Sequence, residues 1–573
     1  MSPTHIRVGT RAGAWPRGLV AAAAGLLVAV FLLPVFLHTP LVDPDEGLHA
    51  AIAREMVERG DWVTPRLLGE PFLDKPALYF WALAACVKAF GPNELAIRLP
   101  GLFFGALGAL AAGLLARRVF GRTAGVLAGV FQASALLPLA LTEVAVHDIA
   151  LVPWTTFAVL AFHAASQAAT TRGTLGWGAV AGVWIGLALL TKALTGVALV
   201  GLPVALWCVG QRQLRPALLG AGVLGLLVGA AIAAPWYAAM EAANPGYLHY
   251  YFVERHLLGY ATTSQLHGQR PWWYYLPFLA AGSLPWLPYA HRPLRVLALA
   301  WKHGQPTTET RGVWLLVTWV AADTAFLSFA GSKLVTYVLP VFPAVVGLAA
   351  HGWADALEAA GTPTAGWRAS HVIACASMAA LGPVCAWTAA AWLTPDAGGA
   401  VSIGFSLALL VAMAAWGLAW VAALLVSRRA GPHALTAVTA AHALTVAIAL
   451  AVCLPVAALP FTARELARHY NAEGRLPARM WFYDERVGSF LYYLDAPLRA
   501  GLTPDRVTHG RPEVLLSLRQ APADTVVVIP VEQLPRLERR IPLARRPFVQ
   551  AGHHRAYDAG DFVAALREAV DGR

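Results

Sequence analysis

Charged side chains are scarce in this sequence. Only 13% of its 573 residues are Asp, Glu, Lys or Arg, whereas 58% are hydrophobic. A soluble domain of this length would carry about twice that charged fraction, so the composition excludes an ordinary soluble protein. The apolar residues form blocks of roughly 18–25 residues, long enough to cross a hydrocarbon core of about 30 Å. The sequence therefore predicts an α-helical polytopic membrane protein.

Cysteine is also rare, and no CxxC or metal-ligand spacing occurs among the five cysteines, which lie in apolar stretches. We interpret them as small buried hydrophobes. The net charge of +11 is spread over short loops, where basic residues orient membrane proteins, which argues against nucleic-acid binding. The run at 19–37 is too long for a signal-peptide core and lacks a cleavage site, so we expect an uncleaved first helix.

The breaks between apolar blocks predict about 13 transmembrane helices. With a cytoplasmic N-terminus, every basic loop falls on one side, as the positive-inside tendency requires. This orientation makes the 38–97 loop, the 239–270 loop and the tail periplasmic. The expected spans are 19–37, 98–116, 123–141, 149–166, 175–190, 194–210, 216–238, 271–290, 313–330, 334–350, 370–393, 401–426 and 433–458.

Two regions outside the spans have patterns of their own. In the first loop we expect an amphipathic helix at 46–59 and an apolar helix at 76–90 that lies in the membrane interface. The tail, 459–573, alternates expected strands and helices, which favours a small soluble α/β domain after a transmembrane catalytic domain at 1–458. The expected tail elements are strands at 480–483 and 525–529 and helices at 487–493 and 562–570.

Ionisable residues gather at the predicted outer boundary of the membrane, where such residues are rare. The cytoplasmic loops carry scattered arginines and few carboxylates, so we expect the chemistry outside. The acids are Asp43, Asp45, Glu46, Asp74 and Asp148, and the cations are Lys75, Lys192, Arg270 and Lys333.

The periplasm has no ATP or nucleotide sugars, so a transferase there needs a donor that is activated on a lipid carrier, such as a polyprenyl-phosphate sugar. The reaction needs a carboxylate that takes a proton from the acceptor and cations that hold the leaving phosphate. Asp45 and Asp148 could supply the first. Lys75, Lys192, Arg270 and Lys333 could supply the second.

Each residue also has a structural interpretation. The acids at 43–46 could cap the following helix, and Asp148 could cap another. The lysines could be anchors that reach from the apolar region to the interface, and His267 could be an ordinary loop histidine. Taken together, these charged residues favour an enzyme more strongly than any one of them does alone.

Seven stretches resemble bacterial lipid-linked glycosyltransferases of the ArnT-like kind, a superfamily that includes the aminoarabinose transferase of lipid A and protein O-mannosyltransferases. The likeness extends over 20–350. The stretches are Asp43–Gly47, Arg54–Met56, Gly60–Trp62, Asp74–Trp81, Leu190–Lys192, Arg270–Pro277 and Ser332–Pro340.

The resemblance implies the GT-C fold and an inverting transfer from a polyprenyl-phosphate sugar that needs no metal cofactor. It places the catalytic acid at Asp45, a second acid at Asp148 and a phosphate-binding lysine at Lys75. A structural zinc, as in one relative, would use Asp74 and His267. Further candidates are Asp43 and Glu46 for catalysis and, for the substrate cavity, His49, Arg54, Tyr79 and Tyr337.

One departure concerns substrate choice, because aminoarabinose transferases carry Arg-Tyr where this chain has Leu48-His49. We expect an inner-membrane enzyme that moves a sugar, for example 4-amino-4-deoxy-L-arabinose, from undecaprenyl phosphate to lipid A or a related glycolipid. One alternative is transfer to protein Ser or Thr. A transporter or flippase would instead show inverted repeats and charges near the bilayer midplane, and the sequence shows neither.

Overall fold

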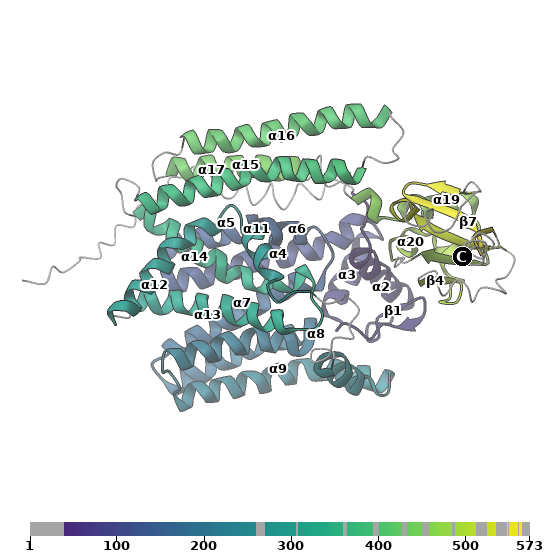
Figure 1. Ribbon diagram of the computed structural model, residues 1–573. Helices are drawn as coiled ribbons and strands as arrows, with labels where there is room; N and C mark the ends of the chain where they lie inside the picture. Colours follow the sequence, from purple (N-terminus) through teal and green to yellow (C-terminus); the bar gives the residue numbers. More distant parts are fainter. Residues whose placement is uncertain are drawn as a thin grey trace, which may run out of the picture.

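The computed structural model describes residues 39–258, 270–304, 307–358, 364–393, 400–426, 432–449, 458–483, 488–510, 524–534, 547, 549–559 and 561–563. A large helical body carries a small α/β domain at one end, beside α2 and α3 (Figure 1). Helices α15 to α17 lie along one edge of the body, and α8 and α9 lie along the opposite edge (Figure 1).

The described part of the chain contains six helices long and apolar enough to span a membrane, or seven if the bent pair α5–α6 counts as one span. The chain is therefore a multi-pass membrane protein. The predicted span 19–37 lies outside the described residues. The long helices of the body, which include these spanning helices, are α4 (Glu94–Phe120), α5 (Arg122–Ser134), α6 (Leu136–Thr142), α7 (His147–Gln167), α8 (Thr171–Gly210), α9 (Pro216–Ala243), α12 (His291–His303), α13 (Thr308–Phe329), α14 (Phe342–Glu358), α15 (Ala365–Leu393), α16 (Ala400–Val426) and α17 (Pro432–Ile448).

The two spans predicted at 175–190 and 194–210 both fall in α8. The backbone is non-helical at Lys192 and Ala193, where φ of Ala193 is 46°. A Cβ added to Gly196 would lie 2.8 Å from the Cβ of Ala188, whereas residues eight positions apart in a straight helix are separated by about 12 Å. The chain therefore reverses at this break, and α8 consists of two antiparallel halves.

The span predicted at 271–290 is wrong as a single helix. The structure has the short helix α11 (Tyr275–Gly282) and the 3-10 turn η3 (Leu287–Ala290) there. Pro285 lies between α11 and η3, and Pro288 is the second residue of η3. Proline has no backbone N–H and clashes with the preceding helical turn, which accounts for the interruption.

The first loop folds against the end of the helical body. It contains α2 (Asp45–Arg59), a two-stranded hairpin of β1 (Arg66–Leu67) and β2 (Glu70–Pro71), and α3 (Leu78–Phe90). Both helices expected in this loop are present. One face of α3 packs into the main core through Tyr79, Phe80 and Leu83.

The α/β domain is built on a five-stranded sheet in the order β4-β3-β5-β7-β6. Strands β4, β3 and β5 are parallel, and β7 runs antiparallel to β5 and β6. The strands expected at 480–483 and 525–529 are β3 and β5, and most of the helix expected at 562–570 lies outside the described residues. The bounds are α19 (Arg464–Glu473), β3 (Arg479–Tyr483), α20 (Gly488–Tyr493), α21 (Ala496–Arg499), β4 (Val507–Gly510), β5 (Thr525–Pro530), β6 (Val549–Ala551) and β7 (His554–Asp558).

Candidate functional site

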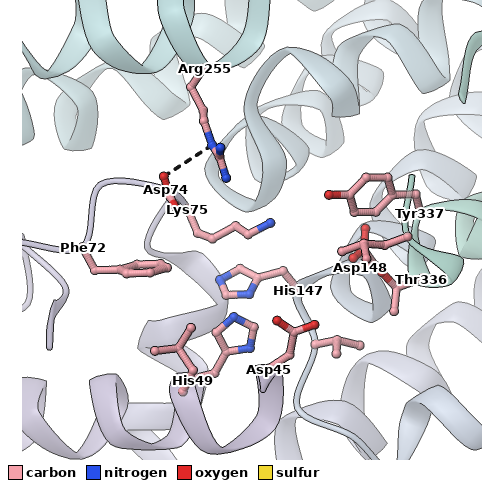
Figure 2. Close-up of a pocket in the computed structure, with 13 residues that line it drawn as sticks. Asp45, His49, Phe72, Asp74, Lys75, His147, Asp148, Arg255, Thr336 and Tyr337 are labelled. Atoms are coloured by element: carbon pink, nitrogen blue, oxygen red, sulfur yellow. Dashed lines mark ion pairs between the residues drawn. The ribbon is translucent and has the colours of Figure 1, made fainter. Parts of the chain in front are cut away.

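A cavity of about 580 Å³, part of it open to solvent, lies where the first loop meets the ends of several helices. It draws on α2, the loop before α3, the start of α7, the π-helical segment η2 (His249–Leu258) and the 3-10 segment η4 (Val335–Val341). Charged and polar side chains converge on it from all of these elements (Figure 2). Its lining residues are Asp45, Leu48, His49, Phe72, Asp74, Lys75, Val146, His147, Asp148, Arg255, Leu334, Thr336 and Tyr337.

Helix α2 contributes Asp45 at its first residue and His49 one turn later. Residues four apart in a helix lie on the same face, so both side chains reach the cavity. The Nδ1 of His49 lies 2.7 Å from the carbonyl oxygen of Ala145, and a carbonyl only accepts, so Nδ1 carries the proton. Burial lowers the pKa of His49. The ring is therefore neutral at pH 7 and packs edge-on against His147, with centroids 4.5 Å apart.

A buried ion pair joins the start of α7 to the reversal in α8; Asp148 lines the cavity, whereas Lys192 does not. The ammonium of Lys192, at the reversal in α8, donates to the carboxylate of Asp148 at the start of α7. Both residues are buried. The same ammonium lies 3.6 Å from the centroid of the Tyr337 ring, a cation–π distance. Each charge is thus compensated by the other.

A second ion pair fixes the loop that carries Lys75. The carboxylate of Asp74 lies 3.3 Å from Nε of Arg255 and accepts a hydrogen bond of 2.8 Å from the Tyr250 hydroxyl. Burial raises the pKa of Tyr250 to about 12, so this hydroxyl keeps its proton. The neighbouring side chain of Lys75 extends above His147 toward the middle of the cavity (Figure 2).

Two charges in the cavity stand apart from these pairs. Within the described part of the chain, Asp45 and Lys75 take part in no ion pair or side-chain hydrogen bond. The cavity therefore presents one carboxylate and one ammonium to a bound molecule.

Asp43 and Glu46, both predicted among the catalytic residues, do not line the cavity. Asp43 accepts hydrogen bonds from the backbone N–H and the hydroxyl of Ser489 in the α/β domain. Glu46 is 1% exposed and lies 3.2 Å from Nε of Arg98 on α4. Both acids are engaged in structural contacts on either side of Asp45.

Arg54 and Tyr79 are also absent from the cavity lining. The Arg54 guanidinium donates to the carbonyl oxygens of Tyr492 and Leu494 in the α/β domain. Tyr79 is fully buried, and its ring lies 4.9 Å from that of His147, behind the cavity wall.

Two of the predicted phosphate-binding cations lie elsewhere. Lys333 donates to the carbonyl oxygens of Ala330, at 2.7 Å, and Arg270, at 3.3 Å. Arg270 itself is exposed, with its guanidinium 6.0 Å from the Tyr274 ring. Neither side chain lines the cavity.

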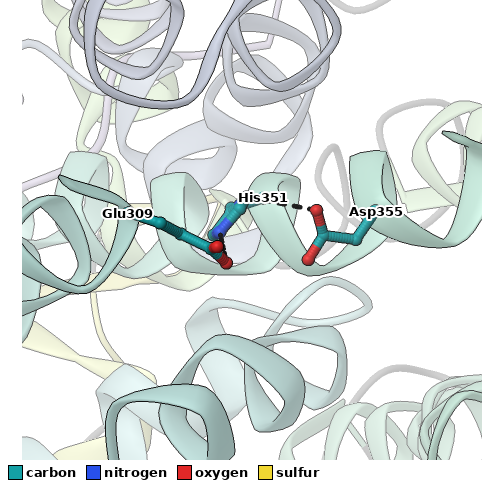
Figure 3. Close-up of side chains that lie close together, drawn as sticks. All are labelled: Glu309, His351 and Asp355. Atoms are coloured by element: carbon teal, nitrogen blue, oxygen red, sulfur yellow. Dashed lines mark hydrogen bonds and ion pairs between the residues drawn. The ribbon is translucent and has the colours of Figure 1, made fainter. Parts of the chain in front are cut away.

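The predicted zinc ligands divide between described and undescribed residues, since His267 lies outside the described ranges and Asp74 is paired with Arg255. Among the described residues one group has metal-compatible spacing: Glu309, His351 and Asp355 (Figure 3). The ion pair between Asp355 and Arg292 supplies a cation there already. Glu309 is the second residue of α13, about 30 Å along that helix from its last residue, Phe329, and no residue of the group lines the cavity.

Six residues line the cavity but were not among the predicted site residues: Arg255, Phe72, Val146, His147, Leu334 and Thr336. Arg255 lies in a π-helical segment, a conformation that often marks functional sites. Apolar periodicity does not reveal such a segment. The sequence signal was the cluster of tyrosines and charges at 247–256, which stands out between apolar spans.

Comparisons with known proteins agree with this architecture. A family model described as dolichyl-phosphate-mannose-protein mannosyltransferase matches residues 74–238, which include Lys75, Asp148 and Lys192. The undecaprenyl phosphate-alpha-4-amino-4-deoxy-L-arabinose arabinosyl transferase of Erwinia tasmaniensis is 33% identical over 348 residues, 60% of this chain and 60% of that protein. The protein of the same name from Shewanella sediminis is 34% identical over 350 residues, 61% of this chain and 62% of that protein. The chain thus matches about three fifths of the length of these curated relatives.

The crystal structure of ArnT from Cupriavidus metallidurans bound to undecaprenyl phosphate superimposes with a TM-score of 0.73 at 23% identity, over 95% of this chain and 98% of that one. The fold therefore places the chain among polytopic membrane proteins with the GT-C fold. Within that class the chain resembles the arabinosyl transferases in sequence over three fifths of its length, and it resembles ArnT in fold over nearly all of its length.

Proposed function

We propose that this protein is an inverting glycosyltransferase that moves a sugar from undecaprenyl phosphate to lipid A or a related envelope glycolipid. The observation that carries the proposal is the pairing of charges in the cavity, where Asp45 and Lys75 remain for a substrate while Asp148 and Asp74 are neutralised. The names of the curated relatives support 4-amino-4-deoxy-L-arabinose as the sugar.

In this mechanism Asp45 receives the proton of the acceptor hydroxyl or phosphate as its oxygen attacks the anomeric carbon. The bond from that carbon to the donor phosphate oxygen breaks, and Lys75 stabilises the charge that builds on the leaving phosphate. Arg255, which also lines the cavity, pairs with Asp74 and so holds the loop that carries Lys75. The Asp148–Lys192 pair shapes the wall under Tyr337. These residues supply the proton acceptor and the phosphate-binding charge, so the reaction needs no metal.

We also propose that the cavity opens to the periplasm, with the N-terminus in the cytoplasm and the 459–573 domain outside the inner membrane. The distribution of basic loops in the sequence supports this orientation. Labelling of single cysteines placed in the α/β domain and in the 211–215 loop by a membrane-impermeant reagent would test it. Labelling of the 211–215 loop alone in intact spheroplasts would reverse the assignment.

The direct test is transfer by purified protein from undecaprenyl-phosphate aminoarabinose to lipid A, with products read by mass. We expect Asp45→Asn to lose at least about 100-fold in rate, in the range of a removed general base. Lys75→Ala should lose both rate and affinity for undecaprenyl phosphate, and EDTA should change neither. Glu55→Gln, on the same helix but away from the cavity, is the matched control. Full activity of Asp45→Asn would refute the mechanism.

Transfer to protein Ser or Thr is the second candidate, because the family model over 74–238 describes a protein mannosyltransferase. Mass spectra of lipid A and of envelope proteins from a deletion strain separate the two acceptors. Loss of a sugar from proteins alone would favour the second.

A further inference from the structure

The segment just before Asp45 is held by the distant α/β domain. The backbone N–H of Asp43 donates to the carbonyl oxygen of Phe461 at 2.6 Å. Two residues earlier, the N–H of Leu41 donates to the Tyr493 hydroxyl at 2.9 Å. The chain therefore enters α2 along the surface of this domain, more than 400 residues away in sequence.

The side chain of Asp43 makes the most buried contact of this junction. Its Oδ1 accepts from the backbone N–H of Ser489 at 3.0 Å, and its Oδ2 accepts from the Ser489 hydroxyl. That hydroxyl also accepts from the backbone N–H of Ala463 at 2.8 Å. Asp43 is 8% exposed and Ser489 is 0% exposed. Hydrogen bonds to an ionised group are stronger than neutral ones, especially where water is excluded.

Two glycines bring the backbones into direct contact beside Asp43. A Cβ on Gly47 would lie 2.9 Å from the Cα of Ser489 and collide with its amide nitrogen. A Cβ on Gly488 would collide with the backbone of Gly47 and Leu48. No larger residue fits at either position without separating the two helices. The first turn of α2 and the first turn of α20 are thus locked at backbone distance.

The opposite side of the same segment is held by the membrane body. Arg98 on α4 donates to the carbonyl oxygen of Thr39 at 2.6 Å and to that of Pro40 at 3.1 Å, and it pairs with Glu46. Asp45 therefore lies between an acid held by the α/β domain, Asp43, and an acid held by the helical body, Glu46.

We propose that the α/β domain is a positioning element of the active site and that Asp43 is the positioning residue through which it acts. The Asp43–Ser489 contact and the glycine junction fix the first turn of α2, and with it the place of the Asp45 carboxylate in the cavity. This inference rests on the proposed function for its activity readout. It gives the C-terminal domain a role that requires no substrate contact.

The test compares three variants of the full-length protein in detergent. Asp43→Ala removes both acceptors, and we expect kcat to fall on the order of 10–100-fold with little change in the KM for the donor, because about 1 Å of misplacement can cost that much. Asp43→Asn keeps an oxygen for the Ser489 N–H and should recover most of the rate. Glu58→Ala breaks the ion pair with Arg499, a contact of the same domain with the far end of α2, and should retain kcat.

A second readout does not need the substrate. Hydrogen–deuterium exchange at residues 45–49 should be faster in Asp43→Ala than in Glu58→Ala or the wild type. If Asp43→Ala fails to fold, Ser489→Ala removes one of the two side-chain bonds and should show the same pattern to a smaller degree.

Three results would overturn the inference: an unchanged kcat in Asp43→Ala, an equal loss in Asp43→Asn, or unchanged exchange at 45–49. An equal loss of kcat in Asp43→Asn would mean that the Asp43 carboxylate takes part in the reaction itself. Failure of the wild type to transfer the sugar would reject the proposed function instead, and the exchange experiment would still decide the role of the domain.

Discussion

Replacing Arg98 tests whether a buried charge network holds the first loop against the membrane body. Arg98 is 7% exposed. Its guanidinium donates to both oxygens of Glu46, at 3.2 and 3.3 Å, and to the carbonyl oxygens of Thr39, Pro40 and Glu143. Truncation would leave the Glu46 carboxylate, which is fully enclosed, without its cation.

The magnitude follows from what the substitution leaves behind. Removing one partner of a buried ion pair costs about 3–5 kcal/mol, because an uncompensated charge stays in a medium of low dielectric. We therefore expect Arg98→Met to lower the free energy of unfolding by about that amount. Replacing both partners with apolar residues can be nearly neutral. The double variant Arg98→Met/Glu46→Leu should accordingly be more stable than Arg98→Met alone.

The assay is the fraction of monodisperse protein that remains after heating in detergent, measured by size-exclusion chromatography for the wild type, both single variants and the double variant. Arg295→Met, on an exposed part of the short helix α12, is the control for loss of an arginine. If Arg98→Met matches the wild type, or if the two substitutions are additive, the network is not what stabilises the first loop.

Three further outcomes follow from the structure. Burial raises the pKa of Glu143 to about 8 from 4.5, so between these pH values the folded state holds a proton that the unfolded chain releases. The stability of the folded protein should therefore fall as pH rises through this window. Unfolding temperatures measured at pH 5, 6.5 and 8 should show this fall in the wild type and a smaller fall in Glu143→Gln. Lys192→Met leaves the buried Asp148 without its partner and should cost about 3–5 kcal/mol in thermal unfolding, a loss that Asp148→Asn should partly repair. Lys333→Ala should bind undecaprenyl phosphate like the wild type in a direct binding assay, since its ammonium is held by the Ala330 carbonyl; a large loss of affinity would place it in the site after all.

Hydropathy predicted most of the helical body because a membrane span must be a long apolar helix, whatever packs against it. It could not predict the 58° bend between α5 and α6 inside the apolar run at 123–141. There the Ser134 carbonyl oxygen lies 2.5 Å from Nε2 of His442, and the Leu136 N–H donates to Leu284. These partners lie about 150 and 300 residues away, so no local pattern reveals them.

The candidate site was predictable where a charge is unusual for its surroundings, which holds for Asp45, Lys75, Asp148 and Lys192. Sequence reasoning could not decide which charges neutralise one another. Lys192 was expected to hold phosphate, and the structure pairs it with Asp148. Arg255 was missed because its importance depends on the fold that brings η2 over Asp74. The pairing of side chains is a property of the tertiary structure. The sequence could therefore predict which charged residues lie at the site, but not which of them form ion pairs and which remain for a substrate.

The run Asp43-Pro44-Asp45-Glu46 sends three neighbouring carboxylates in three directions. One enters the α/β domain, the next enters the cavity and the third enters the helical body. The spacing of these three acids along the chain therefore matters as much as the residue type at each position. Inserting or deleting a single residue here would redirect all three at once, and no substitution elsewhere on α2 would restore their arrangement.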